Sequence, residues 1–335
     1  MLNKIYQHIQ QTIAAFETKD TLILNNKNYP LDQNRYQPIY QHPEPKAITF
    51  IDGGQAEIAL AGNFCLSLVR VAAVTLKNDK KLLQQIQQFY VFTKAVYNHN
   101  NCNNNDNNND NNDCNNYPRN DHEICYESKI FTEKEPLIDE LDLFISSMDQ
   151  TIKAGLERAP IQKIASMARR FAELALASKI NADFIILDGT LEKTFKNEEK
   201  YLPNLPHQTS AIAKTSSLFT TSGNSPAVLL NKISPPGNWV YPVTEKTSFI
   251  KLHPAAKHVF RFEGNKEVLP YLPELSKDAL FLGYPYGLIL ADKLARISHQ
   301  EQKSLSLQLL LKSDSQMISQ YLQNANAHEI LDTIG

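Results

Sequence analysis

Apolar residues recur every three to four positions at the start of the chain, at Ile5, Ile9, Ile13 and Phe16. This spacing predicts an amphipathic helix whose apolar stripe is covered either by the chain's own core or by a partner. A polar stretch with four prolines, Asn25 to Pro45, predicts an extended linker into the first core strand. We therefore expect an N-terminal helix and linker in residues 1–45 and a main domain in residues 46–335.

Alternating and continuous apolar runs predict the strands of that domain. An antiparallel meander is expected from the runs AITFIDGG and FCLSLVRVAAVTL and the segment from Phe89 to Val96. The run ADFIILDGT is apolar on both faces, which is typical of a central strand covered on both sides. Further strands are expected in HEICYESKIF, SAIAKTSSLF, AVLLNKI, TSFIKL and HVFRFE.

Helical periodicity predicts the helices that flank these strands. Two helices are expected between Pro136 and Lys179, with a break near Pro160, and helices dominate from Lys266 onward. The fold class is therefore α/β, a mixed sheet flanked by helices with N- and C-terminal helical additions.

An Asn- and Asp-rich insert interrupts the strands at about residues 98–120. It contains too little apolar surface to offset the entropy of ordering it, so we expect a disordered surface loop. A calcium-binding loop is the alternative, but the central glycine and terminal glutamate of such loops are absent.

Composition and charge narrow the class of protein. A net charge of -2 argues against a globally basic nucleic-acid coat protein, although a local basic groove remains compatible with it. No run of about 18 apolar residues predicts a membrane span, and the N-terminus lacks the apolar core of a signal peptide. The four cysteines form no CxxC pair, so we expect reduced thiols in a cytoplasmic globular protein.

The two runs that end in Asp-Gly carry the main candidate chemistry. Asp52 and Asp188 each follow a buried strand, and either motif alone is equally good turn chemistry. Because both motifs follow apolar runs with helices between them, we expect neighbouring strands that bring the two carboxylates together. Carboxylates suit hard cations such as Mg²⁺ or Mn²⁺, which assist phosphodiester hydrolysis.

Four further residues are candidates for the same site. Glu173 lies on the helix before the second strand and fits either a third acid or an exposed partner of Arg169 or Arg170. Lys214 interrupts an apolar run and fits either a phosphate contact or an edge-strand lysine. Tyr284 precedes Pro285 at an expected helix start, and Asp292 follows two turns later, where an exposed position is the alternative.

The order of these motifs resembles that of the NurA nucleases, which act on DNA ends beside the hexameric HerA translocase. The similar segments are FIDGGQAEI, the glutamate-bearing helix before FIILDGTL, AIAKTSSLF and GYPYGLILADKLARI. The resemblance implies a ribonuclease-H-like fold, a homodimer, and Mn²⁺-dependent 5′-to-3′ exonuclease and single-strand endonuclease activity in the resection of double-strand breaks. It also implies that Asp52, Glu173 and Asp188 bind metal and that Lys214 and Tyr284 belong to the catalytic site. Some family members have a histidine where this chain has Asp292.

Two other functions fit parts of the pattern. Actin-like and sugar-kinase-like ATPases also place Asp-Gly turns at strand ends, but no paired-glycine adenosine loop is visible in the C-terminal half. A non-catalytic module that binds a translocase or a DNA end would not need the acids. Because Asp52, Glu173 and Asp188 are all present, the sequence favours a metal-dependent DNA nuclease.

Overall fold

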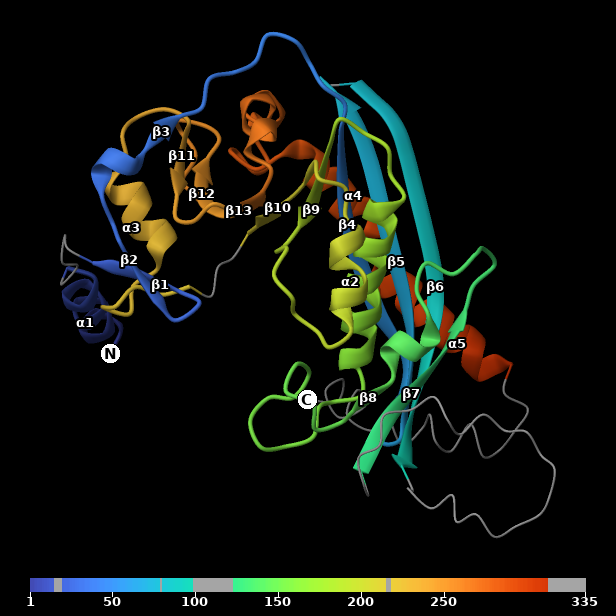
Figure 1. Cartoon of the computed structure of the whole chain (residues 1–335). Helices are drawn as coiled ribbons and strands as arrows, with labels where there is room; N and C mark the ends of the chain where they lie inside the picture. The colour runs from blue at the N-terminus through green and yellow to red at the C-terminus, as the bar shows by residue number, and fades with distance from the viewer. Residues whose placement is uncertain (15–19, 79, 99–122, 215–217, 313–335) are drawn as a thin grey trace.

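The fold is built around one large mixed sheet (Figure 1). The computed structural model describes residues 1–14, 20–78, 80–98, 123–214 and 218–312. The strands are β1 (Thr21–Leu24), β2 (Lys27–Pro30), β3 (Gln37–Pro38), β4 (Ile48–Ala61), β5 (Phe64–Lys77), β6 (Lys80–Asn98), β7 (Glu123–Phe131), β8 (Ile145–Ser146), β9 (Phe184–Asp188), β10 (Thr209–Ala213), β11 (Trp239–Pro242), β12 (Thr247–Lys251) and β13 (Phe260–Gly264). The α-helices are α1 (Leu2–Ala14), α2 (Lys163–Ser178), α3 (Pro226–Ile233), α4 (Tyr286–Ala295) and α5 (His299–Leu311). Short 3₁₀ helices are η1 (Gln33–Arg35), η2 (Glu140–Leu143), η3 (Glu198–Lys200), η4 (Leu202–Asn204), η5 (Lys266–Tyr271) and η6 (Glu274–Ser276).

The strand order of the main sheet is β3-β11-β12-β13-β10-β9-β4-β5-β6-β7-β8. Strands β4 to β7 form an antiparallel meander; the sequence predicted a meander of the first three and a further strand at β7. At the centre, β9 runs parallel to both β4 and β10. The central strand is buried over Phe184–Leu187, which confirms that it is covered on both faces.

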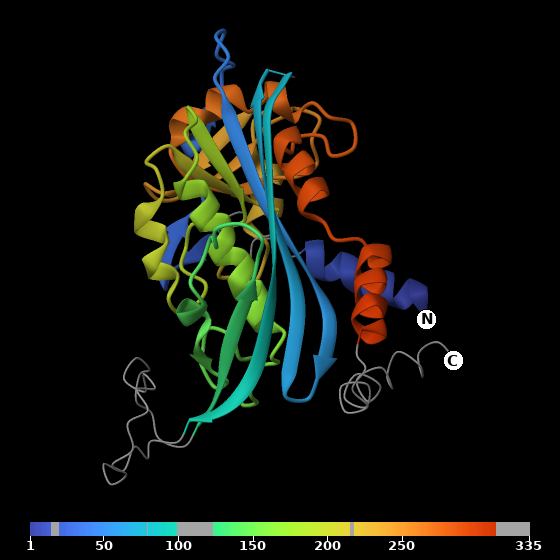
Figure 2. The same cartoon turned by 90° about the vertical axis from the view of Figure 1, so that its right-hand side faces the viewer.

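Helices cover the two faces of the sheet (Figure 2). We call the side against α2 the α2 face; its core includes Ile51, Leu187 and Phe171. We call the opposite side the α4 face; its core includes Phe50 and Ile186, which alternate with the residues of the first set. Helix α5 lies on the same side as α4. Side chains along β4 and β9 therefore point alternately toward α2 and toward α4.

The N-terminal segment is more structured than its polar sequence predicted. Between Asn25 and Pro45, expected to be an extended linker, the chain completes the β1–β2 hairpin and adds β3 to the edge of the main sheet. The hairpin packs through Leu22 and Leu24 on a core with Trp239 and Tyr241. Two buried leucines just before the polar stretch thus anchor the hairpin.

Two other sequence-based expectations were wrong. The first helix expected between Pro136 and Pro160 does not form; that region holds η2, the two-residue strand β8 and turns. Asp139 and Asp149 accept hydrogen bonds from backbone amides two residues ahead, and such local bonds compete with a helix. The run AVLLNKI, expected to be a strand, lies in α3, whose start is marked by Pro226 after Ser225.

Three further expectations concern the Asn-rich insert, the cysteines and membrane-spanning segments. The Asn-rich insert falls almost wholly on residues 99–122, outside the described residues. Cys65 and Cys125 are buried free thiols. Within the described ranges, no helix is both long enough and apolar enough to cross a membrane.

Candidate functional site

The register of the central strands brings Asp52 and Asp188 side by side. Ile51 of β4 is paired with Leu187 of β9, so the next residue on each strand is an aspartate. Asp188 ends β9 as predicted, but Asp52 does not end its strand, because β4 stays paired with β5 as far as Ala61, with a shift of register between Glu57 and Ala59. Asp52 alternates with Ile51 and shares the α4 face with Phe50. Asp188 takes the same face by the same alternation with Leu187 and Ile186.

The glycines after Asp52 bring helices, rather than a ligand, close to β4. A methyl group at Gly53 would lie 2.5 Å from Glu173 Oε1, and one at Gly54 would lie 2.3 Å from the carbonyl oxygen of Ala295. Gly53 therefore admits α2 on one face, and Gly54 admits the end of α4 on the other. On α4 itself, a methyl group at Gly287 would lie 2.0 Å from the Phe50 ring. This close packing fixes both helices around the aspartates.

Glu173 reaches the aspartates from the opposite face of the sheet. It lies on α2, is only 2% exposed, and forms an ion pair with Arg169 at 2.6 Å. Glu173 therefore pairs with Arg169, as one alternative predicted, but it lies on a buried face of α2 and not on an exposed one. Burial raises the pKa of Glu173, while the charges of Arg169 and Arg170 act to lower it.

The charges of both Asp188 and Glu173 act on Asp52. Burial, followed by the charges of Asp188 and Glu173, raises the pKa of Asp52 to about 8. A divalent cation would relieve this repulsion, and carboxylate oxygens are the donors that Mn²⁺ and Mg²⁺ prefer. The donor set of Asp52, Glu173 and Asp188 therefore fits such an ion. In the described ranges, no three His, Cys, Asp or Glu side chains are already arranged to hold one. Ion pairs direct Asp188 toward Lys214 and Glu173 toward Arg169.

Lys214 and Tyr284 complete the α4-face side of the site. Lys214 follows β10, and its Nζ lies 2.5 Å from Asp188 Oδ2 and 5.3 Å from the centre of the Tyr284 ring. Burial acts to lower the pKa of Lys214, but the hydrogen bond and charge of Asp188 outweigh it and raise the pKa. Tyr284 is fully buried, and burial together with Asp188 and Asp52 raises the pKa of its hydroxyl. A protonated lysine and tyrosine thus face the aspartates.

Asp292 lies beside this group rather than within it. It is partly exposed on α4 and pairs with Arg296 one turn later. Its negative charge nevertheless contributes to raising the pKa of Lys214 and of Tyr284. Helix α4 begins at Tyr286, directly after Pro285, so a helix starts where the sequence predicted and Tyr284 precedes it.

Sequence reasoning missed a buried network behind Asp188. Arg170 pairs with Glu198 at 2.8 Å and donates to the carbonyl oxygen of Thr190 at 2.6 Å. Glu263 accepts bonds from the Thr190 hydroxyl and the Leu191 amide. These contacts hold the loop that follows Asp188. Glu198 lies in a polar run with no periodicity, so the sequence contained no signal for its burial.

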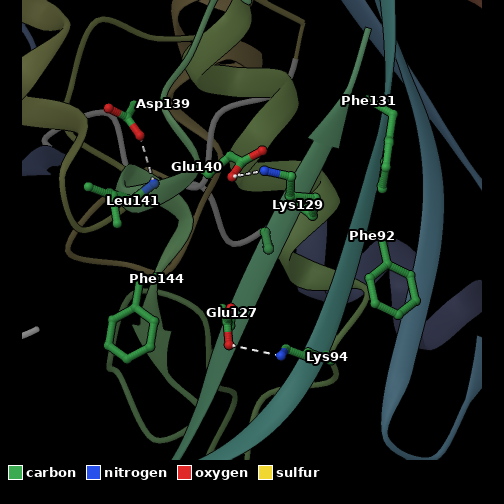
Figure 3. Close-up of a pocket in the computed structure, with 10 residues that line it drawn as sticks. Phe92, Lys94, Glu127, Lys129, Phe131, Asp139, Glu140, Leu141 and Phe144 are labelled. Carbon is green, nitrogen blue, oxygen red and sulfur yellow. Dashed lines mark hydrogen bonds and ion pairs between the residues drawn. The ribbon is translucent and has the colours of Figure 1, made fainter. Parts of the chain in front are cut away.

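A separate pocket of about 470 Å³ lies on β6, β7 and η2 (Figure 3). Two ion pairs line it, Lys94 with Glu127 at 3.2 Å and Lys129 with Glu140 at 3.1 Å. None of its lining residues belongs to the carboxylate site. The remaining charged residue of the lining, Asp139, accepts a hydrogen bond from the Leu141 amide. Because its charged side chains are engaged in these contacts, this pocket is a weaker candidate for chemistry than Asp52 and Asp188.

The fold of the chain is similar to that of a solved nuclease. No family model and no curated protein matches the sequence. The NurA nuclease from Sulfolobus solfataricus gives a TM-score of 0.50 at 13% identity, over 94% of this chain and 95% of that chain. Endonuclease V of Ciona intestinalis, in complex with inosine-containing DNA, gives 0.37 at 10% identity, over 79% and 89%. The similarity to the NurA nuclease shows that the chain has a NurA-like fold, which confirms the predicted mixed α/β sheet flanked by helices.

The raised pKa of Asp52 makes a testable prediction about stability. Between the ordinary value of 3.8 and about 8, the folded protein keeps a proton at Asp52 that the unfolded chain releases. Stability therefore falls as the pH rises through this window. Because Asp52→Asn removes the titrating group, its melting temperature in EDTA should exceed that of the wild type by a margin that grows from about pH 5 to about pH 8. Equal margins at both pH values would contradict the prediction.

Proposed function

We propose that this chain is a metal-dependent nuclease that hydrolyses DNA at a site formed by Asp52, Glu173 and Asp188. The observation that supports this most directly is the placement of the three acids: Asp52 and Asp188 directly follow the paired residues Ile51 and Leu187, and Glu173 Oε1 would lie 2.5 Å from a methyl group on the next residue of β4, Gly53. Structural support comes from the NurA-like fold, in which Asp52 and Asp188 of this chain lie on central strands of the sheet and Glu173 lies on the helix that covers them. Buried carboxylates that are neighbours repel one another, which is unfavourable unless a cation binds them.

The side chains of the site have distinct roles in this proposal. Asp52, Asp188 and Glu173 would hold Mn²⁺ or Mg²⁺, which when bound supplies Lewis-acid activation of water and of the phosphate. Lys214 places its ammonium group next to Asp188. This group can contact the scissile phosphate once a metal ion binds the Asp188 carboxylate. Tyr284 packs beneath Lys214 and restricts where its ammonium group lies. Asp292 adds negative charge that keeps Lys214 protonated.

The finer functional assignment rests on the resemblance of motifs and on the fold. We propose Mn²⁺-dependent 5′-to-3′ exonuclease and single-strand endonuclease activity, acting in double-strand break resection with a HerA-type hexameric ATPase. We also propose a homodimer. In α1, Ile5 and Ile9 are each 47% exposed, so the described part of the chain leaves these two apolar residues available to a partner or a sister subunit.

The direct test is incubation of the purified full chain with end-labelled single- and double-stranded DNA. We expect cleavage with Mn²⁺ that EDTA abolishes, and products shortened from the 5′ end. Labels at either end distinguish this polarity from the reverse. ATP hydrolysis without DNA cleavage would instead favour an actin-like or sugar-kinase-like ATPase.

A further inference from the structure

The guanidinium group of Arg169 ties Glu173 to the strand that carries Asp52. Arg169 Nη1 donates to Glu173 Oε1 at 2.6 Å and to the Gly53 carbonyl oxygen at 3.3 Å. Its Nε donates to Gln55 Oε1 at 3.1 Å. The Gln55 amide in turn donates to Ser166 Oγ on α2 at 2.7 Å. Arg169 and Gln55 thus form a closed set of contacts between α2 and β4.

These contacts matter because Glu173 comes from a different face than the aspartates. A glutamate side chain has three rotatable torsions, and a ligand is effective only when its carboxylate is held in place. The ion pair engages Oε1, so a cation bound through Oε2 would leave it intact. Hydrogen bonds of this kind to ligating carboxylates orient them and strengthen metal binding.

We propose that Arg169, itself held by Gln55, is a positioning residue that fixes Glu173 for divalent cation binding. This inference rests on the proposed nuclease function, because it requires Glu173 to be the third acid of the metal site. Arg169 is not assigned contact with the reacting phosphate. Its side chain is 32% exposed, so the same geometry also allows a direct phosphate contact, which the experiment separates from positioning.

The test measures Mn²⁺ affinity of the full chain by calorimetry without DNA. For Arg169→Met we expect affinity to fall by about 10- to 100-fold, the usual effect of losing a partner of a metal ligand. Arg169→Lys, which keeps the charge but not the planar fork, should restore part of the loss. Gln55→Leu keeps the ion pair and removes the Nε acceptor together with the bond to Ser166. A smaller loss of affinity is therefore expected from it, even if Arg169→Met fails to fold.

The matched control is Arg296→Met. Arg296 also pairs with an acid one helical turn away, Asp292, and its removal changes the net charge by the same amount. Affinity for Mn²⁺ should stay within about threefold of the wild type, because this arginine does not hold one of the three acids.

Each outcome bears on a different claim. If the wild type binds no Mn²⁺, the proposed function fails and this inference fails with it. If the wild type binds Mn²⁺ and Arg169→Met binds it equally well or more tightly, only the inference is overturned. Unchanged Mn²⁺ affinity combined with weaker DNA binding would make Arg169 a phosphate contact and would also overturn positioning.

Discussion

Asp52→Asn and Asp188→Asn are each expected to lower DNA cleavage by at least about a thousandfold, which corresponds to about 4 kcal/mol of lost transition-state stabilisation. Each change keeps the size of the side chain and removes the charge that would hold the cation. Because the two residues are adjacent on parallel strands, the double variant should lose little more than either single variant. Initial rates on end-labelled DNA with saturating Mn²⁺ measure the effect.

Asp183→Asn is the control for that comparison. Asp183 lies just before β9, at the opposite end of the strand from Asp188, and is exposed. Its Oδ2 accepts a hydrogen bond from the Ala47 amide, which an asparagine oxygen can also accept. Cleavage by this variant should match the wild type. If Asp52→Asn and Asp188→Asn also cleave normally while folded, the site assignment is wrong.

The parts of the fold that the sequence predicted are those encoded by local patterns. The meander β4–β6, the strand β7 and the buried strand β9 follow from apolar patterns, and the repeated Asp-Gly motif correctly placed Asp52 beside Asp188. Helix α2 was predicted from its spacing, and its packing on the sheet buries Glu173. Whether these acids bind metal remains a prediction.

The missed features depend on contacts between distant segments. Asp-Gly usually ends a strand, but pairing with β5 on one side keeps β4 extended past Asp52 while β9 stops on the other. Local patterns also did not predict that Gly53 and Gly54 let α2 and α4 approach β4 closely. These contacts join elements that are far apart in the sequence, so no local pattern predicts them.

Arg170→Met is expected to cost about 3 to 5 kcal/mol of folding stability, because it leaves the carboxylate of Glu198 buried without its partner. Glu198 is fully buried, and its Oε2 already accepts bonds from the amides of Thr194 and Phe195, which cannot replace the lost positive charge. Urea unfolding followed by circular dichroism measures the change. Lys193→Met removes an ion pair of similar length, 2.7 Å to Glu199, but both partners are about half exposed. That control should cost no more than about 1 kcal/mol.

The double variant Arg170→Met with Glu198→Leu separates burial of charge from loss of the contact itself. If the cost of Arg170→Met comes from an unpaired buried charge, removing the charge as well should recover part of the stability, despite the amides left at Thr194 and Phe195. Strict additivity of the two single changes would show that the pair is not coupled.

Because the same arginine holds the Thr190 carbonyl two residues after Asp188, Arg170→Met should also lower Mn²⁺-dependent cleavage at temperatures where it remains folded. A destabilised variant with undiminished cleavage would show that the network supports the fold without shaping the site.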